Sequence, residues 1–285
     1  MVEVKDYAPA MDYQWCPGCG NFGIVAALRN ALVALNLEPS QVLLVSGIGQ
    51  AGKMPHYLHS HVFNELHGRA LPAAQAAKIV NTELEVIAIG GDGDGYGEGG
   101  NHFLGAMHRN VDMTYIVCNN QVYGLTKGQA SPTSDQGFVS HTTPDGSWVP
   151  MRALAIAIAA DCSFIARGFA GSAEQLSRLI QMGIQHKGFA LVEVLQPCVS
   201  FNHTNTFAWY KQRVYDVESE GHYDPADRSN AFQKAMEWGE RIPTGVLYKK
   251  ERPTYESRLS ALKEIPLVRQ GVNPLDYQSL VDEFM

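Results

Sequence analysis

Short apolar runs typical of buried strands alternate with helical stretches through the first 200 residues, and this alternation limits the fold more than any other feature. The strand-like runs are VLLVSGIG from Val42, LEVIAIGG from Leu84, MTYIVCNN from Met113, SFIAR from Ser163 and FALVEVLQPC from Phe189. Helical periodicity follows Asn21, a predicted N-cap, and also covers 71–80, 99–109, 150–160 and 172–186. Strands that are apolar on both faces and separated by helices predict an α/β fold, with a parallel sheet between two helix layers.

The pattern weakens beyond about residue 200, where the chain keeps one helical stretch at 231–240 and a tail that contains prolines. We therefore expect two parts, a domain over 1–200 and an irregular extension over 201–285 that packs on the core or on a partner. With 285 residues, 45% of them apolar and 18% charged, the chain can bury a core of ordinary size.

The charge and the cysteine content limit the partners and the compartment. A formal charge of −7 argues against nucleic acid or an anionic membrane as the main partner. The sequence shows neither a membrane-spanning run nor a basic segment followed by an apolar core, so we expect a soluble cytoplasmic protein. Five cysteines without a secretory signal favour metal binding, redox chemistry or simple burial over a disulfide framework.

The stretch IAIGGDGDGYGEGGNHF places Gly91, Asp92 and Gly93 where the predicted strand from Leu84 ends. Glycines at such a position let the backbone approach a ligand closely, and the following helix can offer its first amides to an anion. Binding sites of parallel sheets lie at the carboxyl ends of the strands. A glycine-rich turn with solvated aspartates is the alternative, and the dinucleotide spacing G-x-G-x-x-G is not convincingly present.

A second polar segment, CNNQVYGLT, follows the next predicted strand, so that Asp92 and the pair Asn119-Asn120 come from neighbouring strand ends. A carboxylate, an amide oxygen and a nearby backbone carbonyl suit Mg²⁺, which completes its shell with phosphate oxygens and water. Together the two segments predict a site for a magnesium-bridged diphosphate.

Six motifs in order resemble the β subunit of the 2-oxoacid:ferredoxin oxidoreductases, a family of thiamine diphosphate enzymes. They are WCPGCGN, SGIG, HGRA, GGDGDGY, NNQVYGLTKGQASPT and LQPC, and the resemblance runs from Trp15 to about Tyr215 with an echo in EWGERIPTGVLY. The resemblance implies a thiamine diphosphate-binding fold of the diphosphate type. It implies Mg²⁺ ligands at Asp92, Asn120 and the carbonyl of Val122, with cofactor contacts at Gly49, His67, Gly91 and Gly93.

The resemblance also implies partners and a reaction. We expect an α subunit that carries the activating glutamate and the coenzyme A site, and ferredoxin as the electron acceptor. The implied reaction is the CoA-dependent oxidative decarboxylation of a 2-oxoacid to acyl-CoA and CO2, or the reverse carboxylation. Among substrates we favour 2-oxoglutarate, which the compact two-subunit members of the family often accept, with pyruvate as the alternative. The distal carboxylate of a dicarboxylate needs an extra cation or amide donors, which can come from the partner.

Lys127 in KGQASPT and Lys53 in GQAGK are candidates for contacting the substrate carboxylate or an intermediate, and the resemblance favours Lys127. Leu125 is a candidate wall of the substrate pocket. The simpler interpretations are two solvated lysines and a buried loop leucine.

Cys16 and Cys19 form a C-x-x-C motif, and Cys198 follows the last predicted strand, from which it can return to the same end of the sheet. The resemblance implies that these three residues bind a 4Fe-4S cluster. Relatives have a fourth cysteine in SGIGC, where this chain has Gln50. A fourth ligand from His56, a carboxylate, Gln50 or water, a three-iron cluster and a lost cluster are the alternatives.

Cys118 lies inside a predicted strand and Cys162 precedes one, so both are expected to be small buried hydrophobic residues. Two other classes of protein compete with the favoured one. In a thiamine enzyme without electron transfer, such as a decarboxylase or carboligase, the cysteines would be structural and the protein would lack iron. A nucleotide-binding regulatory module would bind a nucleotide in place of thiamine diphosphate and Mg²⁺.

Overall fold

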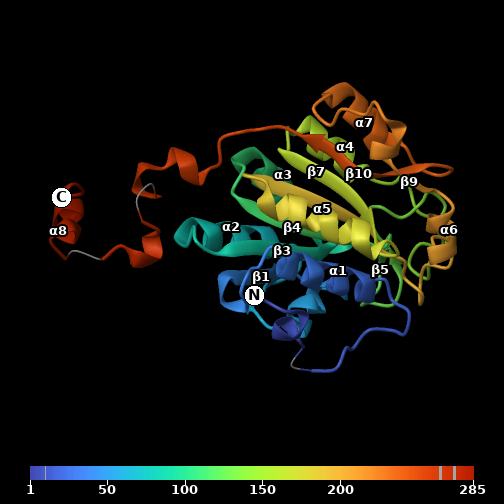
Figure 1. Cartoon of the computed structure of the whole chain (residues 1–285), viewed down its shortest axis with the longest axis horizontal. Helices are drawn as coiled ribbons and strands as arrows, with labels where there is room; N and C mark the ends of the chain where they lie inside the picture. Colours follow the sequence, from blue (N-terminus) through green and yellow to red (C-terminus); the bar gives the residue numbers. More distant parts are fainter. Residues whose placement is uncertain (10, 263–264, 272–273) are drawn as a thin grey trace.

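A single mixed sheet with helices on both faces forms the centre of the molecule (Figure 1). The computed structural model describes residues 1–9, 11–262, 265–271 and 274–285. Across the sheet, the strands are β2 (His61–Asn64), β1 (Val42–Ser46), β3 (Glu85–Gly91), β4 (Met113–Asn119), β8 (Phe189–Leu195), β7 (Phe164–Phe169), β10 (Ile242–Lys249) and β9 (Val214–Asp216). The pairs from β2 to β7 are parallel, β10 is antiparallel to β7, and β9 is parallel to β10. The predicted α/β fold with a largely parallel sheet is confirmed.

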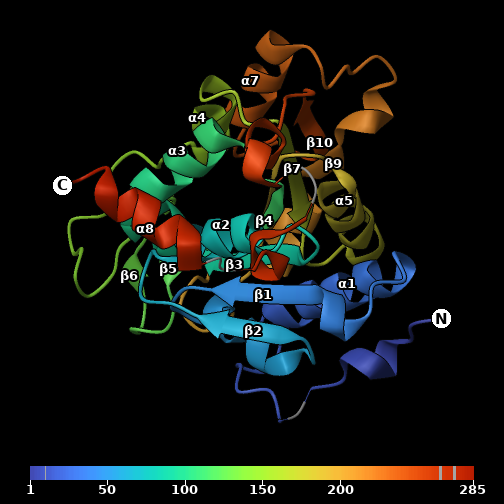
Figure 2. The ribbon, with the colours of Figure 1, turned by 90° about the vertical axis from the view of Figure 1, so that its left-hand side faces the viewer.

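The helices form two layers, which Figure 2 shows on opposite sides of the sheet. One face carries α1 (Asn21–Ala34) and α5 (Ala173–Gln185), and the other carries α2 (Ala70–Val80), α3 (Gly100–Arg109), α4 (Ala153–Ala159) and α7 (Arg228–Met236). The short α6 (Phe207–Lys211) and α8 (Pro274–Asp282) belong to the C-terminal part. Over the described ranges, no helix has both the length and the apolar character that crossing a bilayer requires.

The central strands β3 and β4 are apolar because both of their faces are covered. In β3, Ile87 and Ile89 belong to the core beneath α1 and α5, whereas Val86 and Ala88 belong to the core beneath the other layer. All four side chains are fully buried. Burying each of the larger ones stabilises the fold by about 1.5–3 kcal/mol, which explains why the sequence shows continuous apolar runs here and no polar alternation.

Asn21 is not the N-cap of the first helix, contrary to the sequence-based expectation. It is the first residue of α1, the cap position belongs to Gly20, and no side chain caps the helix. The Asn21 side chain is fully buried. The helix begins one residue earlier than the capping pattern predicts because Gly20 packs directly on the segment after β8, where its backbone nitrogen donates to the carbonyl of Pro197 at 3.2 Å.

Residues after 200 supply β9 and β10 to the main sheet, and neither strand was expected. Pro243 and Gly245 interrupt the β10 sequence, Gly245 has a φ of +106°, and the pairing with β7 shifts register between Val246 and Tyr248. Such irregularities hide a strand from pattern analysis. Residues after 200 therefore complete the sheet that the first 200 residues begin. The division into a domain over 1–200 and an extension over 201–285 stays a prediction.

Glu85, at the start of β3, makes the free energy of unfolding depend on pH. Burial raises the pKa of its carboxyl from 4.5 to about 7, against the lowering influence of Lys78. Because the folded pKa lies above the unfolded one, stability is lost as pH rises from about 4.5 to about 7. The shift corresponds to at most about 3 kcal/mol, and partial exposure reduces it.

We therefore expect Glu85→Gln to raise the free energy of unfolding at pH 8 by roughly 1–2 kcal/mol and to leave it nearly unchanged at pH 4.5. Urea unfolding at the two pH values measures the effect. Glu251→Gln, at an exposed position, serves as the control and should change little at either pH. Equal effects of the two substitutions would contradict the interpretation.

Candidate functional site

A narrow cavity of about 70 Å³ lies at the carboxyl ends of β1, β3 and β4. The turns that follow these strands form its wall together with the hairpin of β5 (Val122–Tyr123) and β6 (Gln129–Ala130). Eight residues that the sequence analysis assigned to the site line this cavity: Gly49, His67, Gly91, Asp92, Gly93, Asn120, Val122 and Leu125. The parallel strands bring these residues together because their carboxyl ends meet at one edge of the sheet.

The carboxylate of Asp92 is buried and held in one orientation. The residue is 1% exposed, and its Oδ2 accepts hydrogen bonds from the hydroxyls of Ser131 at 2.5 Å and Thr133 at 2.6 Å. Its Oδ1 accepts a longer bond, 3.4 Å, from the backbone nitrogen of Asn120. Burial raises the pKa of this carboxyl, while the three hydrogen bonds lower it. The hydrogen bonds fix the orientation of the carboxylate and offset part of the cost of burying its charge, which a bound cation would offset further.

The turn after β4 brings the backbone of Asn120 against Asp92. The Asn120 side-chain oxygen accepts from the backbone nitrogen of Val122 at 3.0 Å, and Gln121 between them has a φ of +59°. From the C-terminal part of the chain, Asn202 donates to the Asn120 carbonyl at 3.2 Å. Asp92, Asn120 and Val122 line the same cavity, and a carboxylate, an amide oxygen and a backbone carbonyl are a donor set that Mg²⁺ accepts.

Gly93 is required by close packing at the mouth of this turn. A Cβ atom at this position would lie 2.2 Å from a ring carbon of Tyr123. The Tyr123 hydroxyl donates to the Gly93 carbonyl at 3.4 Å, so that the hairpin lies directly against the aspartate turn. Any larger residue at position 93 would push the two walls of the cavity apart.

Asp94 is a site residue that the sequence analysis missed. It is 3% exposed, and its Oδ1 accepts from the backbone nitrogens of Ile48 at 2.9 Å and Gly68 at 2.8 Å. The same oxygen lies 3.3 Å from Nδ1 of His67. Burial raises the pKa of the Asp94 carboxyl. This side chain ties the turns after β1, β2 and β3 together, and the second aspartate of the GDGD stretch was the available signal.

A buried ion pair between the neighbouring strands β7 and β8 is linked to the cavity by hydrogen bonds. Glu193 of β8 accepts from Nε of Arg167 of β7 at 2.9 Å, and the two side chains are 3% and 5% exposed. The other carboxylate oxygen accepts from the Tyr96 hydroxyl at 3.1 Å and from the Asn119 amide at 3.2 Å. The Asn119 oxygen lies 2.8 Å from the hydroxyl of Thr133, which also contacts the aspartate of the cavity. The ion pair thus fixes the groups that orient this aspartate.

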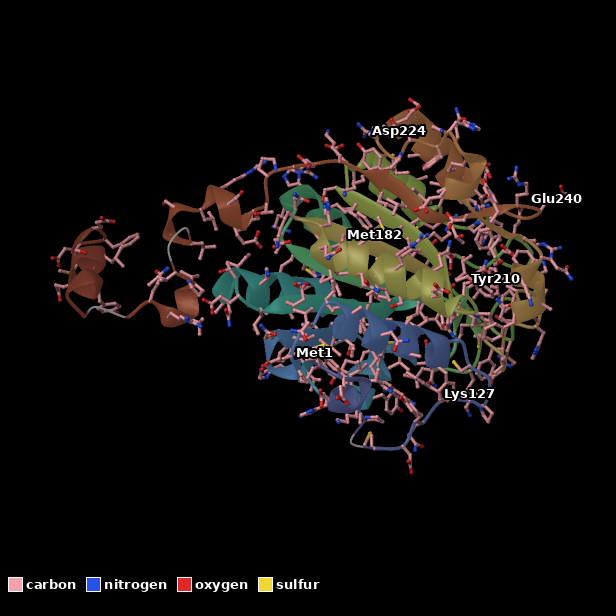
Figure 3. The ribbon with its side chains drawn as sticks, in the orientation of Figure 1. Met1, Lys127, Met182, Tyr210, Asp224 and Glu240 are labelled. Atoms are coloured by element: carbon pink, nitrogen blue, oxygen red, sulfur yellow. The ribbon has the colours of Figure 1, made fainter. Side chains whose placement is uncertain are left out.

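The two lysine candidates do not line the cavity. Lys53 donates from Nζ to the backbone oxygen of Gln14 at 3.4 Å. Lys127 is exposed on the loop between β5 and β6, and Figure 3 places it at the same end of the molecule as Tyr210. It has a φ of +77°, in a region that non-glycine residues seldom adopt. Leu125 lines the cavity and is 43% exposed, so it can contact a substrate from the rim.

The segments that carry the three cysteine candidates lie side by side. Cys16 and Cys19 are in the turn before α1, where the backbone nitrogen of Cys19 donates to the Cys16 carbonyl at 3.0 Å. The pKa of the Cys19 thiol is raised to about 11, chiefly by burial, with a smaller contribution from the neighbouring Cys198 and Cys16. Cys118 and Cys162 are fully buried in the core, as expected.

These three cysteines do not form a tight site for a single ion. Across the described ranges, no group of three histidine, cysteine, aspartate or glutamate side chains is close enough to hold one metal ion. A cubane cluster is itself several ångströms wide and joins thiolates that lie farther apart than the ligands of one ion. Within the described residues the three cysteines thus do not form a preformed three-ligand site for one ion.

Gln50, at the position where the resemblance implies a fourth cysteine, lies between the cysteine turn and the cavity. Its backbone oxygen accepts from Nε1 of Trp15 at 2.8 Å, and the residue lines the cavity. Its Oε1 is buried and has no hydrogen-bond partner in the described part of the chain. A buried amide oxygen without a partner is costly, so this atom is suited to contact a bound group.

Two known families match the chain. The one described as thiamine pyrophosphate enzyme, C-terminal TPP binding domain, matches residues 42–194. The other is the C-terminal family of the pyruvate ferredoxin oxidoreductase beta subunit, which matches residues 198–264. The first covers the strands and turns that form the cavity, and the second covers the segment that adds β9 and β10.

Curated relatives and a solved structure agree with these matches. The 2-oxoacid:ferredoxin oxidoreductase subunit beta of Saccharolobus solfataricus is 45% identical over 259 residues, covering 86% of this chain and 85% of the relative. The 2-oxoglutarate oxidoreductase subunit KorB of Mycobacterium tuberculosis is 39% identical over 70% of this chain and 53% of the relative.

The solved structure is a 2-oxoglutarate:ferredoxin oxidoreductase from Magnetococcus marinus with 2-oxoglutarate, coenzyme A and succinyl-CoA bound. It superposes with a TM-score of 0.90 at 34% identity, over 98% of this chain and 96% of the other. The resemblance carried by six short motifs thus extends over the whole fold. The chain belongs to the β subunits of the 2-oxoacid:ferredoxin oxidoreductases.

Proposed function

We propose that this chain holds the diphosphate end of thiamine diphosphate through Mg²⁺ in a 2-oxoglutarate:ferredoxin oxidoreductase. The observation that carries the proposal is the meeting of Asp92 and Asn120 in one cavity at neighbouring strand ends. The donor set fits the ion, because it combines one fixed carboxylate with an amide oxygen and carbonyls and leaves room for phosphate oxygens and water. Asp92, Asn120 and the carbonyl of Val122 are the proposed ligands.

The size of the cavity supports a second subunit at the site. Ligand pockets that enclose a molecule of this size hold roughly 300 Å³ or more, whereas the cavity measures about 70 Å³. This chain therefore grips one end of the cofactor, and we propose that an α subunit encloses the other end and supplies the activating glutamate and the coenzyme A site. When bound, thiamine diphosphate supplies the carbanion-stabilising chemistry of 2-oxoacid decarboxylation.

The exposed rim of the cavity is the proposed substrate side. Leu125 offers an apolar wall, and Lys127 lies two residues further along the same loop with a free ammonium group in the described structure. A non-glycine backbone held at positive φ costs on the order of 1–3 kcal/mol, and such residues are enriched at functional sites. We propose that Lys127 contacts the substrate carboxylate once the rim is covered by the α subunit. We propose Lys53 only as a secondary contact, since its ammonium group donates to Gln14.

The substrate preference follows the relatives. Both the KorB relative and the Magnetococcus structure are named for 2-oxoglutarate. We propose that 2-oxoglutarate is converted to an acyl-CoA and CO2, with the two electrons leaving one at a time through the cluster to ferredoxin. Co-expression with the α subunit, followed by dye-reduction assays with CoA and several 2-oxoacids, tests this. A higher kcat/KM for pyruvate than for 2-oxoglutarate would overturn the substrate assignment, and no reduction with any 2-oxoacid would overturn the function.

We further propose that Cys16, Cys19 and Cys198 bind a 4Fe-4S cluster whose fourth position lacks a cysteine. Cys198→Ser should then lower the iron content from about four to at most about three per chain, because a serine hydroxyl is a poor ligand for this iron. Iron and sulfide analysis of the purified complex measures the loss. Cys162→Ser, a buried cysteine outside the group, should retain the iron of the parent protein. A complete cluster in Cys198→Ser would remove the third ligand.

A further inference from the structure

Gln196 places a buried amide against one of the proposed cluster ligands. It directly follows β8, where its backbone nitrogen donates to the Asn119 carbonyl at 2.9 Å and extends the sheet by one residue. The side chain is 2% exposed, and its Nε2 lies 3.5 Å from Sγ of Cys19 and 3.3 Å from the carbonyl of Pro197. Nε2 carries two hydrogens, so it can donate to both acceptors at once.

The packing around Gln196 holds this amide in place. A Cβ atom on Gly20 would lie 2.8 Å from Cγ of Gln196, so only glycine lets the cysteine turn come this close. The backbone nitrogen of Gly20 also donates to the carbonyl of Pro197 at 3.2 Å. The Gln196 side chain is therefore packed between the turn that contains Cys16 and Cys19 and the segment that leads to Cys198.

The Gln196 amide destabilises the fold relative to an apolar side chain that would only fill the same space. Its Oε1 is buried and makes no hydrogen bond with any described residue. A buried polar atom without a partner costs roughly 1–3 kcal/mol. An apolar side chain of the same length would fill the space without this cost, so the retained donor points to a role at the sulfur.

We propose that Gln196 is a positioning residue that raises the reduction potential of the cluster by donating an N–H hydrogen bond to the sulfur of Cys19. This inference rests on the proposed function, because it requires a cluster on Cys16, Cys19 and Cys198. Reduction adds one electron and hence one negative charge to the cluster. A donor aimed at a ligand sulfur stabilises the reduced state more than the oxidised state, which raises the potential.

The test uses the αβ complex with Gln196→Met, which keeps the length of the side chain and removes the donor. We expect the iron content of the parent protein and a reduction equilibrium shifted about tenfold toward the oxidised cluster, which is about 59 mV for one electron. A dithionite titration followed by electron paramagnetic resonance measures the midpoint. Gln75→Met is the matched control, since Gln75 is also buried, with its amide donating to the Leu71 carbonyl at 3.2 Å.

A second variant keeps the inference testable if Gln196→Met loses its cluster. Gln196→Glu keeps the size and polarity, and its carboxylate should lower the potential at high pH but not at low pH, where a protonated carboxyl can donate again. A potential equal to that of the parent protein at all pH values, with a full cluster, would overturn the role of Gln196. A parent complex without iron would instead refute the cluster proposal itself.

Discussion

Asp92→Ala is expected to reduce the affinity for thiamine diphosphate with Mg²⁺ by about a thousandfold, or about 4 kcal/mol, and to abolish substrate-dependent dye reduction. The substitution removes the one carboxylate among the proposed Mg²⁺ ligands. It also removes the acceptor that Ser131 and Thr133 hold in place. Titration of the αβ complex with the cofactor, followed by tryptophan fluorescence, gives the affinity.

The fold should survive this change. Because burial raises the pKa of the Asp92 carboxyl, the charged group is a cost to the unliganded protein, and its removal should not lower the unfolding midpoint. Asp92→Asn keeps the shape and one ligand oxygen but lacks the charge, so its affinity should lie between those of the parent protein and of Asp92→Ala. Unchanged affinity in Asp92→Ala would exclude the proposed metal position.

Arg167→Met is expected to lower the free energy of unfolding by about 3–5 kcal/mol, because it leaves the Glu193 charge buried without its counterion. The two side chains are 5% and 3% exposed, so solvent cannot replace the lost partner. Cofactor affinity should fall as well, since Glu193 holds the Asn119 amide at 3.2 Å beside the hydroxyl that orients Asp92. Urea unfolding and cofactor titration of the same preparation measure both effects.

The double variant Arg167→Met with Glu193→Gln provides the control. It removes both charges and leaves a neutral acceptor for the Tyr96 hydroxyl and the Asn119 amide. It should therefore recover most of the stability that Arg167→Met loses, which makes the coupling between the two positions measurable. A double variant as unstable as the sum of the two single changes would show that the ion pair has no special role.

The central strands of the sheet and the residues that line the cavity can be predicted from the sequence for the same reason. Strands such as β3 are covered on both faces, so their apolar runs are unbroken, and the polar residues that follow them must meet at one edge. Gly91, Asp92 and Asn120 could therefore be placed together from strand order alone. The segment from 42 to 195 is the part in which local pattern and tertiary burial agree.

The sequence could not predict features that depend on contacts between distant segments. The sequence pattern predicts only that Gln196 ends a strand. The contact of its amide with Cys19 becomes visible once the structure packs Gly20 against the Gln196 side chain. Glu193 and Arg167 break two apolar strands with charges, which pattern analysis leaves unexplained until the strands are paired in register. The antiparallel β10 was missed because Pro243 and Gly245 interrupt its sequence.

The late position of β10 in the chain has a consequence for biosynthesis. Until β10 leaves the ribosome, about 80 residues after β7, the outer backbone groups of β7 lack the partner that completes the sheet. At a translation rate of roughly 5–20 residues per second, this edge of β7 stays unpaired in the nascent chain for about 4 to 16 s. Unpaired edges recruit other chains. Chaperone supply during translation should therefore govern the yield of this protein more than the speed at which its completed form folds.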